Sequence, residues 1–244
     1  MTTSTDLLPV SVTLRGNVGP GTADYARSKV HTALEDVGGS VRNVSVVLDW
    51  QRNPALLCPA RAEASADIDG TLIRAKSVRP TMQEAIDELE DRLRRRVRQV
   101  EENRRSHHRR HRSTRHEWRH GDRPRPIPAF CFRPIEEREI VRHKAHVATA
   151  LTPDEASYEM ELLDHDFFLF YNLETGSPAV LRRVEPHTYA VDSLPPELSE
   201  AQARERLEMA GDSMVFFIDA GSGEARVLYL RHDGHYGSIT LVKS

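Results

Sequence analysis

The chain has 244 residues, of which 39% are hydrophobic and 29% are charged, and its formal net charge is −3. This length has room for two or three small domains, and the polar composition argues against one large compact globule. Residues 1–10 do not resemble a signal peptide, and no apolar run reaches the roughly 18 residues that a membrane helix needs. The two cysteines, Cys58 and Cys131, lack metal-ligand spacing and do not suggest a disulfide framework, so we expect a cytoplasmic protein.

The first hundred residues have the pattern of a β-α-β-β-β-α domain. The expected elements are a strand at 10–14, a helix at 22–37, a strand at 41–50, and a hairpin of 61–68 and 71–77 around the turn Asp69-Gly70. A second helix follows, with Thr81 as its N-cap and Glu84 completing a capping box. Its apolar residues form one stripe, which predicts a helix packed on the sheet.

An arginine-rich belt follows in residues 92–125. It holds fourteen arginines, five histidines and no lysine against four acidic residues, a net charge of +10, so the rest of the chain carries −13. Arginine makes bidentate contacts with phosphate and stacks on bases, so the belt indicates a polyanionic partner, RNA before membrane. Residues 104–135 lose apolar periodicity and are predicted to be a flexible linker. The alternative is that the charged helix continues to about His111.

The N-terminal unit, with a three- or four-stranded sheet and both helices on one face, resembles double-stranded-RNA-binding domains, which recognise A-form shape and phosphate. Arg74 and Lys76 are spaced to share one face of a strand. The predicted RNA-binding residues are Arg15, Arg74, Lys76, Arg79, Arg92, Arg94, Arg95 and Arg98. The alternative for each of them is a solvated charged face. The histidines of the belt lack a cysteine or carboxylate cluster at zinc-like spacing, so no metal site is expected.

An internal repeat occupies the C-terminal part of the chain. Residues 151–191 align with 198–238 at a constant offset of 47, and eight pairs are identical. Each copy begins with a helix-capping pattern and continues into a small antiparallel sheet. One copy is too small to bury much core alone, but two can pack on each other. The predicted class is α+β, and the predicted domains are an RNA-binding domain at 1–103, the linker at 104–135, and two repeats at 136–192 and 193–244.

The most apolar stretch is the strand Phe167–Tyr171, in the first repeat. Because alternate residues face opposite sides of a strand, both of its faces are apolar, which favours a partner sheet from the other repeat or from another chain. The predicted residues of this pairing surface are Phe168, Phe170, Val180, Phe217, Val227 and Tyr236. The alternative is a strand buried within its own repeat.

Nothing in the sequence argues for an enzyme or a cofactor. Glu159 and Glu161 are two residues apart and face different sides of a helix. The Asp164–Asp166 segment contains a histidine between two carboxylates but has no associated nucleophile motif. A glycine-rich phosphate loop is absent, so we expect neither catalysis nor a bound cofactor.

The chain resembles long-form ribosome hibernation promoting factors over nearly its full length. The segments that carry the resemblance are Ile73–Lys76, Met82–Asp87, the arginine-rich helix Leu93–Arg98, Ile140–Lys144 and Met160–Phe170. The resemblance implies an N-terminal domain that binds the decoding region and mRNA channel of the small ribosomal subunit, contacts rRNA and blocks mRNA and tRNA in stressed cells. It also implies a C-terminal domain that dimerises and thereby joins two ribosomes.

Two departures from the family pattern matter. The family has one C-terminal domain, whereas this chain has two. The family's Asp-Gly-x-Tyr-Gly pattern occurs only in the second repeat, at Asp233–Gly237, and its His-Asp-Phe-Phe string only in the first, at His165–Phe168. We therefore predict that the repeats pair within one chain and that the protein keeps ribosomes single. The alternatives are a factor that joins two ribosomes and a stress regulator that binds nucleic acid non-specifically or a protein partner.

Overall fold

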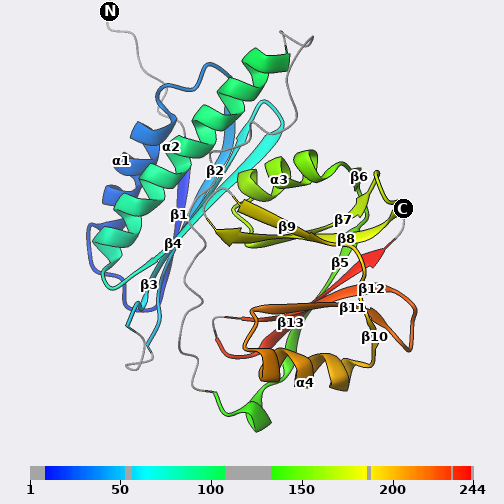
Figure 1. Ribbon diagram of the computed structural model, residues 1–244. Helices are drawn as coiled ribbons and strands as arrows, with labels where there is room; N and C mark the ends of the chain where they lie inside the picture. The colour runs from blue at the N-terminus through cyan, green and yellow to red at the C-terminus, as the bar shows by residue number, and fades with distance from the viewer. Residues whose placement is uncertain (1–8, 53–56, 108–132, 186–187, 232, 243–244) are drawn as a thin grey trace, which may run out of the picture. The chain divides into compact units, whose positions relative to one another are not determined.

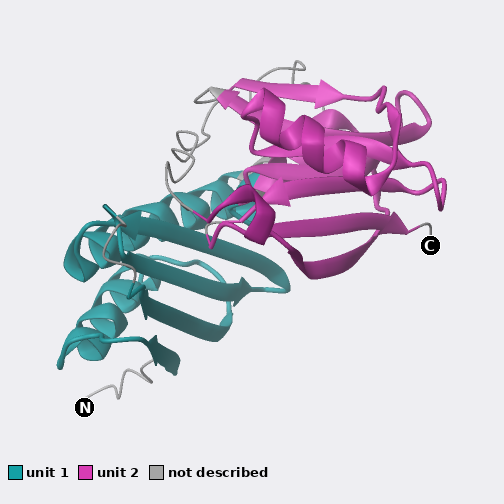
Figure 2. Cartoon of the chain, turned by 90° about the horizontal axis from the view of Figure 1, so that it is seen from below, with its two compact units in different colours: residues 1–120, 161–164 teal, residues 121–160, 165–244 magenta. Residues whose placement is uncertain are grey.

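The computed structural model of the protein describes residues 9–52, 57–107, 133–185, 188–231 and 233–242 (Figure 1). The chain forms two compact units, Met1–His120 with Glu161–Asp164 and Gly121–Met160 with His165–Ser244 (Figure 2). Both units combine helices with sheets, which confirms the predicted α+β class. Among the described residues, no helix combines the length and the apolar character that spanning a membrane requires.

The first unit has the predicted order of elements. They are β1 (Val10–Arg15), α1 (Thr22–Leu34), β2 (Val41–Trp50), β3 (Ala60–Ile68), β4 (Thr71–Arg79) and α2 (Met82–His107). The sheet order is β1-β2-β3-β4, with β1 parallel to β2 and the other neighbours antiparallel. Asp69 and Gly70 both have positive φ, 48° and 86°, as a type I′ turn requires. Helix α2 extends to His107, into the range predicted as linker, and residues 108–132 lie outside the described residues.

Helices α1 and α2 lie on the same face of this sheet (Figure 1). In β3, residues with buried side chains alternate with half-buried ones, and four of the buried residues are alanines that leave room for the helices. The stripe of α2 is buried at Leu89, Leu93, Val97 and Val100. Apolar burial therefore holds one face of the sheet, and the other face, called here the open face, is not covered by α1 or α2.

The second unit contains both repeats, called repeat 1 (136–192) and repeat 2 (193–244), except for Glu161–Asp164 of repeat 1, which belong to the first unit. Its elements are η1 (Ile135–Glu137), β5 (Ile140–Val147), β6 (Ala150–Leu151), α3 (Pro153–Leu162), β7 (Phe167–Asn172), β8 (Ser177–Glu185), β9 (Thr188–Asp192), β10 (Glu197–Leu198), α4 (Glu200–Ala210), β11 (Met214–Asp219), β12 (Ala225–Leu230) and β13 (Tyr236–Val242). They form a four-stranded sheet of order β6-β7-β8-β9 and a five-stranded sheet of order β10-β11-β12-β13-β5. The two repeats thus share one sequence of elements, from a short strand and a helix to three antiparallel strands.

The helix starts in both repeats follow the predicted capping patterns. The backbone N–H of Thr152 donates to Glu155 Oε2 (2.9 Å), and the N–H of Glu155 donates to Thr152 Oγ1 (3.3 Å). Ser199 and Gln202 make the same reciprocal pair before α4. In unit 1, α2 begins after Thr81, whose hydroxyl accepts a backbone N–H. These local bonds satisfy N–H groups that the first turn of a helix leaves without partners.

Strand β5 belongs to the sheet of repeat 2, although it precedes repeat 1 in the chain. It runs parallel to β13, from the Ile140–Tyr236 pair to the Val147–Val242 pair. The backbone N–H of Ala148 still bonds to Val242, and the carbonyl of Thr149 already accepts from a residue of β7. The chain therefore passes from one sheet to the other within two residues. The paired residues are almost a hundred positions apart, so no local pattern in the sequence indicates this pairing.

Clusters of buried apolar side chains organise the second unit, and two of them include the sheet of repeat 2. One lies between α4 and its own sheet and contains Ala203, Leu207, Val215, Phe217, Leu228 and Tyr236. The other contains residues of both sheets, namely Leu169 and Val180 from repeat 1 and Phe216, Ala225, Val227 and Leu241 from repeat 2. Because this second cluster draws on both repeats, the faces of the two sheets that point away from their helices share one core.

Candidate nucleic-acid interface and inter-repeat surface

The open face of the unit 1 sheet is polar. The register places three rows of residues across it, which are Ser11-Ser45-Ser65-Arg74, Thr13-Val47-Glu63-Lys76 and Arg15-Asp49-Arg61-Val78. Three predicted RNA-binding residues, Arg15, Arg74 and Lys76, therefore lie on this face. Arg61 also lies there, paired with Glu63 (3.2 Å), and was missed although the alternation of its strand indicates the same side. Cations separated by hydroxyl groups suit contacts to phosphates of a polyanion.

Three other predicted residues are held by carboxylates of α2. Arg79 Nη2 lies 2.6 Å from Glu88 Oε1, and Arg92 Nη2 lies 3.2 Å from the same oxygen. Arg94 pairs with Glu90 one turn earlier on the helix (2.7 Å). Arg79 also points to the helix-covered side of β4, opposite to Arg74. The structure thus does not bring these three side chains together with those of the open face, because carboxylates of α2 engage them.

The remaining two predicted residues, Arg95 and Arg98, are exposed on α2, away from its buried stripe. Within the described part of the chain, Arg98 makes no ion pair. On α1, by contrast, Lys29 is 2.8 Å from Glu90 and 3.0 Å from Asp87. The hydrogen bonds to Glu90 and then to Asp87 raise the pKa of Lys29. Glu90 thus binds a cation from each helix, Lys29 of α1 and Arg94 of α2.

Of the six residues predicted for the inter-repeat surface, two lie in the cluster that both sheets share and four lie elsewhere. Val180 and Val227 lie in the cluster that both sheets share. Phe217 and Tyr236 lie in the cluster between α4 and its sheet. Phe168 and Phe170 are buried and alternate along β7 with Leu169, so they face the opposite side from the shared cluster, and the Phe168 ring meets the His146 ring edge-on at 5.8 Å. Three consecutive residues are buried in β7 and in β11, so both faces of each strand are apolar and the sequence pattern does not show which face meets the other sheet.

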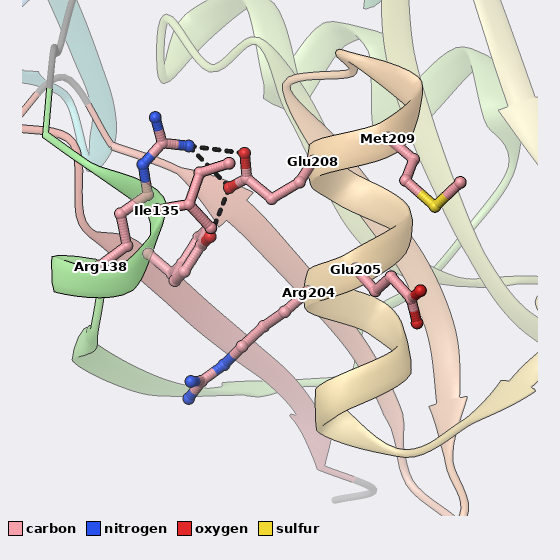
Figure 3. A pocket seen from close by; sticks show the side chains of 7 residues that line it. Ile135, Arg138, Arg204, Glu205, Glu208 and Met209 are labelled. Carbon is pink, nitrogen blue, oxygen red and sulfur yellow. Dashed lines mark hydrogen bonds and ion pairs between the residues drawn. The ribbon is translucent and has the colours of Figure 1, made fainter.

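A small open pocket lies beside α4 (Figure 3). Its walls are Ile135, Arg138, Arg204, Glu205, Glu208, Met209 and Tyr236. Arg138 Nη1 donates to both carboxylate oxygens of Glu208 (2.6 and 2.7 Å), and the Tyr236 hydroxyl donates to the same carboxylate. Burial and the nearby Glu208 raise the pKa of Tyr236 to about 12. This network ties the segment before β5 to repeat 2 and satisfies the polar groups that it buries.

The described residues contain no group of three or more His, Cys, Asp or Glu side chains placed to hold a metal ion. The belt histidines from His108 to His120 lie outside the part of the chain that the structure describes.

Two family models match the chain. Residues 10–105 match the model described as Sigma 54 modulation protein / S30EA ribosomal protein. The model described as Sigma 54 modulation/S30EA ribosomal protein C terminus matches twice, at residues 135–191 and 194–237. The two C-terminal matches correspond to the two repeats.

Several curated relatives are similar over part of the chain. The ribosome hibernation promotion factor of Mycobacterium tuberculosis (strain ATCC 25618 / H37Rv) is 31% identical over 188 residues, which cover 65% of this chain and 78% of the relative. The factor of the same description from Picosynechococcus sp. is 27% identical and covers 65% and 82%. The dormancy associated translation inhibitor of M. tuberculosis is 32% identical over 147 residues, which cover 48% of this chain and 54% of the relative. The chain therefore spans about half the length of that last relative.

Among solved structures, the N-terminal domain of Thermus thermophilus Protein Y aligns with 38% of this chain and 99% of its own, at 24% identity and a TM-score of 0.33. A ribosomal subunit interface protein from Coxiella burnetii aligns with 38% of this chain and 97% of its own, at 16% identity and the same TM-score.

Proposed function

Because the chain belongs to the Sigma 54 modulation protein / S30EA ribosomal protein family, we propose that it is a ribosome hibernation factor. It acts in the cytoplasm by occupying the decoding region and mRNA channel of the small ribosomal subunit, where it blocks mRNA and tRNA and preserves inactive ribosomes under stress. Its mechanism is steric occlusion and not catalysis. The observation that carries the proposal is that the family's N-terminal and C-terminal domain models match the chain in their usual order. Relatives described as ribosome hibernation promotion factors support it.

The charges of unit 1 support rRNA as the ligand. Arg15, Arg74 and Lys76 on the open face, together with Arg98 on α2, offer positive charge to phosphates. Each phosphate contact releases condensed counterions, so the affinity falls steeply as salt rises. Arg79 and Arg94 would have to exchange a carboxylate of α2 for a phosphate, so we expect them to contribute less to binding.

The shared core of the two sheets supports the second part of the proposal, which is that the repeats pair within one chain. Such pairing occupies the apolar sheet faces that two chains would otherwise use to associate. The protein then keeps ribosomes single. Factors that join two ribosomes need a C-terminal surface that remains available to a second copy.

The test is sedimentation of purified ribosomes through sucrose gradients with the protein, followed by detection of the protein in each fraction. The test variant is Arg15→Glu, Arg74→Glu and Arg98→Glu together. The control is Arg27→Glu, Arg204→Glu and Arg206→Glu, which changes the net charge equally at other sites. We expect wild type and control to migrate with single ribosomes and the test variant to remain largely at the top.

Salt and competition sharpen the result. The slope of log affinity against log salt should become shallower by about 0.7–0.9 for each phosphate contact that the variant loses. Bound protein should be displaced by tRNA and mRNA on the small subunit. Binding that is indifferent to both competitors would favour a general nucleic-acid binder, and a new peak of paired ribosomes would show that the repeats still associate between chains.

A further inference from the structure

The inner faces of the two sheets, which meet in the shared core, are equivalent in position but different in chemistry. In repeat 2 the face consists of Met214, Phe216, Ile218, Ala225, Val227, Tyr229, Gly237, Ile239 and Leu241. The equivalent residues of repeat 1, 47 positions earlier, are Phe167, Leu169, Tyr171, Pro178, Val180, Arg182, Ala190, Asp192 and Leu194. The face of repeat 2 is apolar across three strands. The face of repeat 1 is apolar on two strands and ends in an ion pair between Arg182 and Asp192 (2.9 Å).

One aromatic contact across the core shows how the faces fit. The rings of Phe167 from repeat 1 and Tyr229 from repeat 2 have centroids 5.5 Å apart, inclined at 57°. Gly237 provides the space for the Tyr229 ring, since a Cβ atom there would lie only 2.3–2.6 Å from the ring atoms. A real Cβ cannot come that close to a ring, so the Tyr229 position requires glycine at its cross-strand neighbour.

The residues that make this aromatic contact do not occur at the equivalent positions of the other repeat. Where repeat 2 has Tyr229 and Gly237, repeat 1 has Arg182 and Ala190, which are likewise cross-strand neighbours. Where repeat 1 has Phe167, repeat 2 has Met214. Phe167 is therefore on one repeat, and Tyr229 and Gly237, against which it packs, are on the other.

Pairing like with like would lose these features. Two repeat 1 faces would bring two Arg182–Asp192 ion pairs into the contact. The attraction within a buried ion pair offsets little of the hydration free energy that its charges lose. Two repeat 2 faces would lack Phe167, so the aromatic contact with Tyr229 would be lost. A symmetric dimer needs one self-complementary patch, and neither face is one.

The backbone pairing of β5 also favours contact between the two different repeats. It precedes repeat 1 but bonds to β13 of repeat 2, which offers it seven residues. The corresponding strand of repeat 1, β9, has five. The Arg138–Glu208 ion pair, at 2.6 Å, fastens the segment before β5 to repeat 2 as well.

We propose that the two inner faces are complementary and not self-complementary, so that repeat 1 recognises repeat 2 and rejects a second repeat 1. The partner of each face is the other repeat. This inference rests on the internal pairing proposed above and adds which residues select the partner. It also accounts for the difference between the copies, in which Tyr229 and Gly237 lie in repeat 2 and Phe167 lies in repeat 1.

The test exchanges the faces within the full chain. Variant A gives repeat 2 the residues of repeat 1 through Met214→Phe, Tyr229→Arg, Gly237→Ala and Ile239→Asp. Variant B makes the reverse change through Phe167→Met, Arg182→Tyr, Ala190→Gly and Asp192→Ile. Variant C combines all eight. Thermal unfolding and sedimentation velocity are measured for each without ribosomes.

We expect A and B to unfold at temperatures several degrees below wild type, and C to regain at least half of the summed loss while remaining monomeric. Independent sites would instead give additive losses. A C variant as unstable as the sum of A and B would overturn the proposal, as would an A or B variant as stable as wild type.

A gentler set covers the case in which A and B do not fold. This set consists of Phe167→Leu, Tyr229→Leu and the variant that combines them. The loss in Tm of the combined variant should be clearly smaller than the sum of the two single losses, and additive losses would count against complementarity. Failure of the proposed function is distinguishable, because it appears as a wild-type dimer or as loss of ribosome association. Either result leaves the comparison of A, B and C interpretable.

Discussion

The two units use the same building plan, a sheet with helices on one face, but they differ in what happens to the second face. In unit 1 the second face carries serine, threonine and charged side chains such as Arg74 and Lys76, and α1 and α2 do not cover it. In unit 2 the second face carries apolar residues such as Leu169 in the sheet of repeat 1 and Phe216 in the sheet of repeat 2, and the other sheet covers it. The residues at alternate strand positions thus decide whether a sheet offers a polar binding surface or needs an apolar partner.

The difference has energetic consequences. Burial of apolar surface stabilises by about 25 cal/mol per Å², so the shared face of unit 2 should contribute strongly to the free energy of unfolding. Exposed charged pairs contribute about 0–1 kcal/mol, so the open face of unit 1 should matter little for stability and much for salt-dependent binding. Substitutions on the two faces should therefore separate stability from binding.

The largest effect is expected in the shared core. Val227→Asp places a carboxylate at a position with 0% exposure and should reduce the free energy of unfolding of unit 2 by about 4 kcal/mol or more. The matched control is Val191→Asp on β9, where the valine is 37% exposed. Chemical denaturation of the full chain measures both. Equal losses for the two variants would contradict a shared core at Val227.

The second prediction contrasts the two faces of β4. Arg74→Glu, on the open face, should change the free energy of unfolding by less than about 0.5 kcal/mol. Its neighbour Ile73 is fully buried on the helix side, so Ile73→Glu should cost several times more. Denaturation curves of the two single variants provide the comparison, and a large loss from Arg74→Glu would mean that the open face is structural.

The smallest effect concerns pH at the rim of the shared face. Burial, with Lys144 adding to the effect, lowers the pKa of His146 below its ordinary value of 6.5, against a backbone hydrogen bond with Leu169 that raises it. Well above pH 6.5 the imidazole is neutral in both the folded and the unfolded state. As the pH falls below 6.5, the unfolded chain binds the proton first, so the stability decreases until the pH has passed the folded pKa.

Melting temperatures at pH 7.5 and 5.5 measure this contribution. His146→Gln should reduce the difference between the two melting temperatures. His143→Gln, at an exposed position of the same strand, should leave that difference close to that of wild type. If His146→Gln retains the full difference, other groups of unit 2 cause it.

Local interactions explain what was predictable. The capping residues Thr152 and Ser199 set the starts of α3 and α4, and the Asp69-Gly70 turn set the β3–β4 hairpin, because each depends on neighbours within a few residues. Alternation placed Arg74 and Lys76 on one strand face. Along β7 and β11 both faces are apolar, so alternation does not show which face meets the other sheet, and Leu169 and Phe216 lie in the shared cluster rather than Phe168 and Phe217.

The sequence by itself determined the order of elements, the repeat and the positive charge, since periodicity, turn chemistry and composition are properties of short segments. Only the tertiary structure decided that β5 joins the sheet of repeat 2, that Glu88 of α2 pairs with Arg79 of β4, and that Gly237 leaves room for the ring of Tyr229. Each of these depends on which distant segments meet once apolar faces are buried, and pairings between distant segments leave no local pattern in the chain.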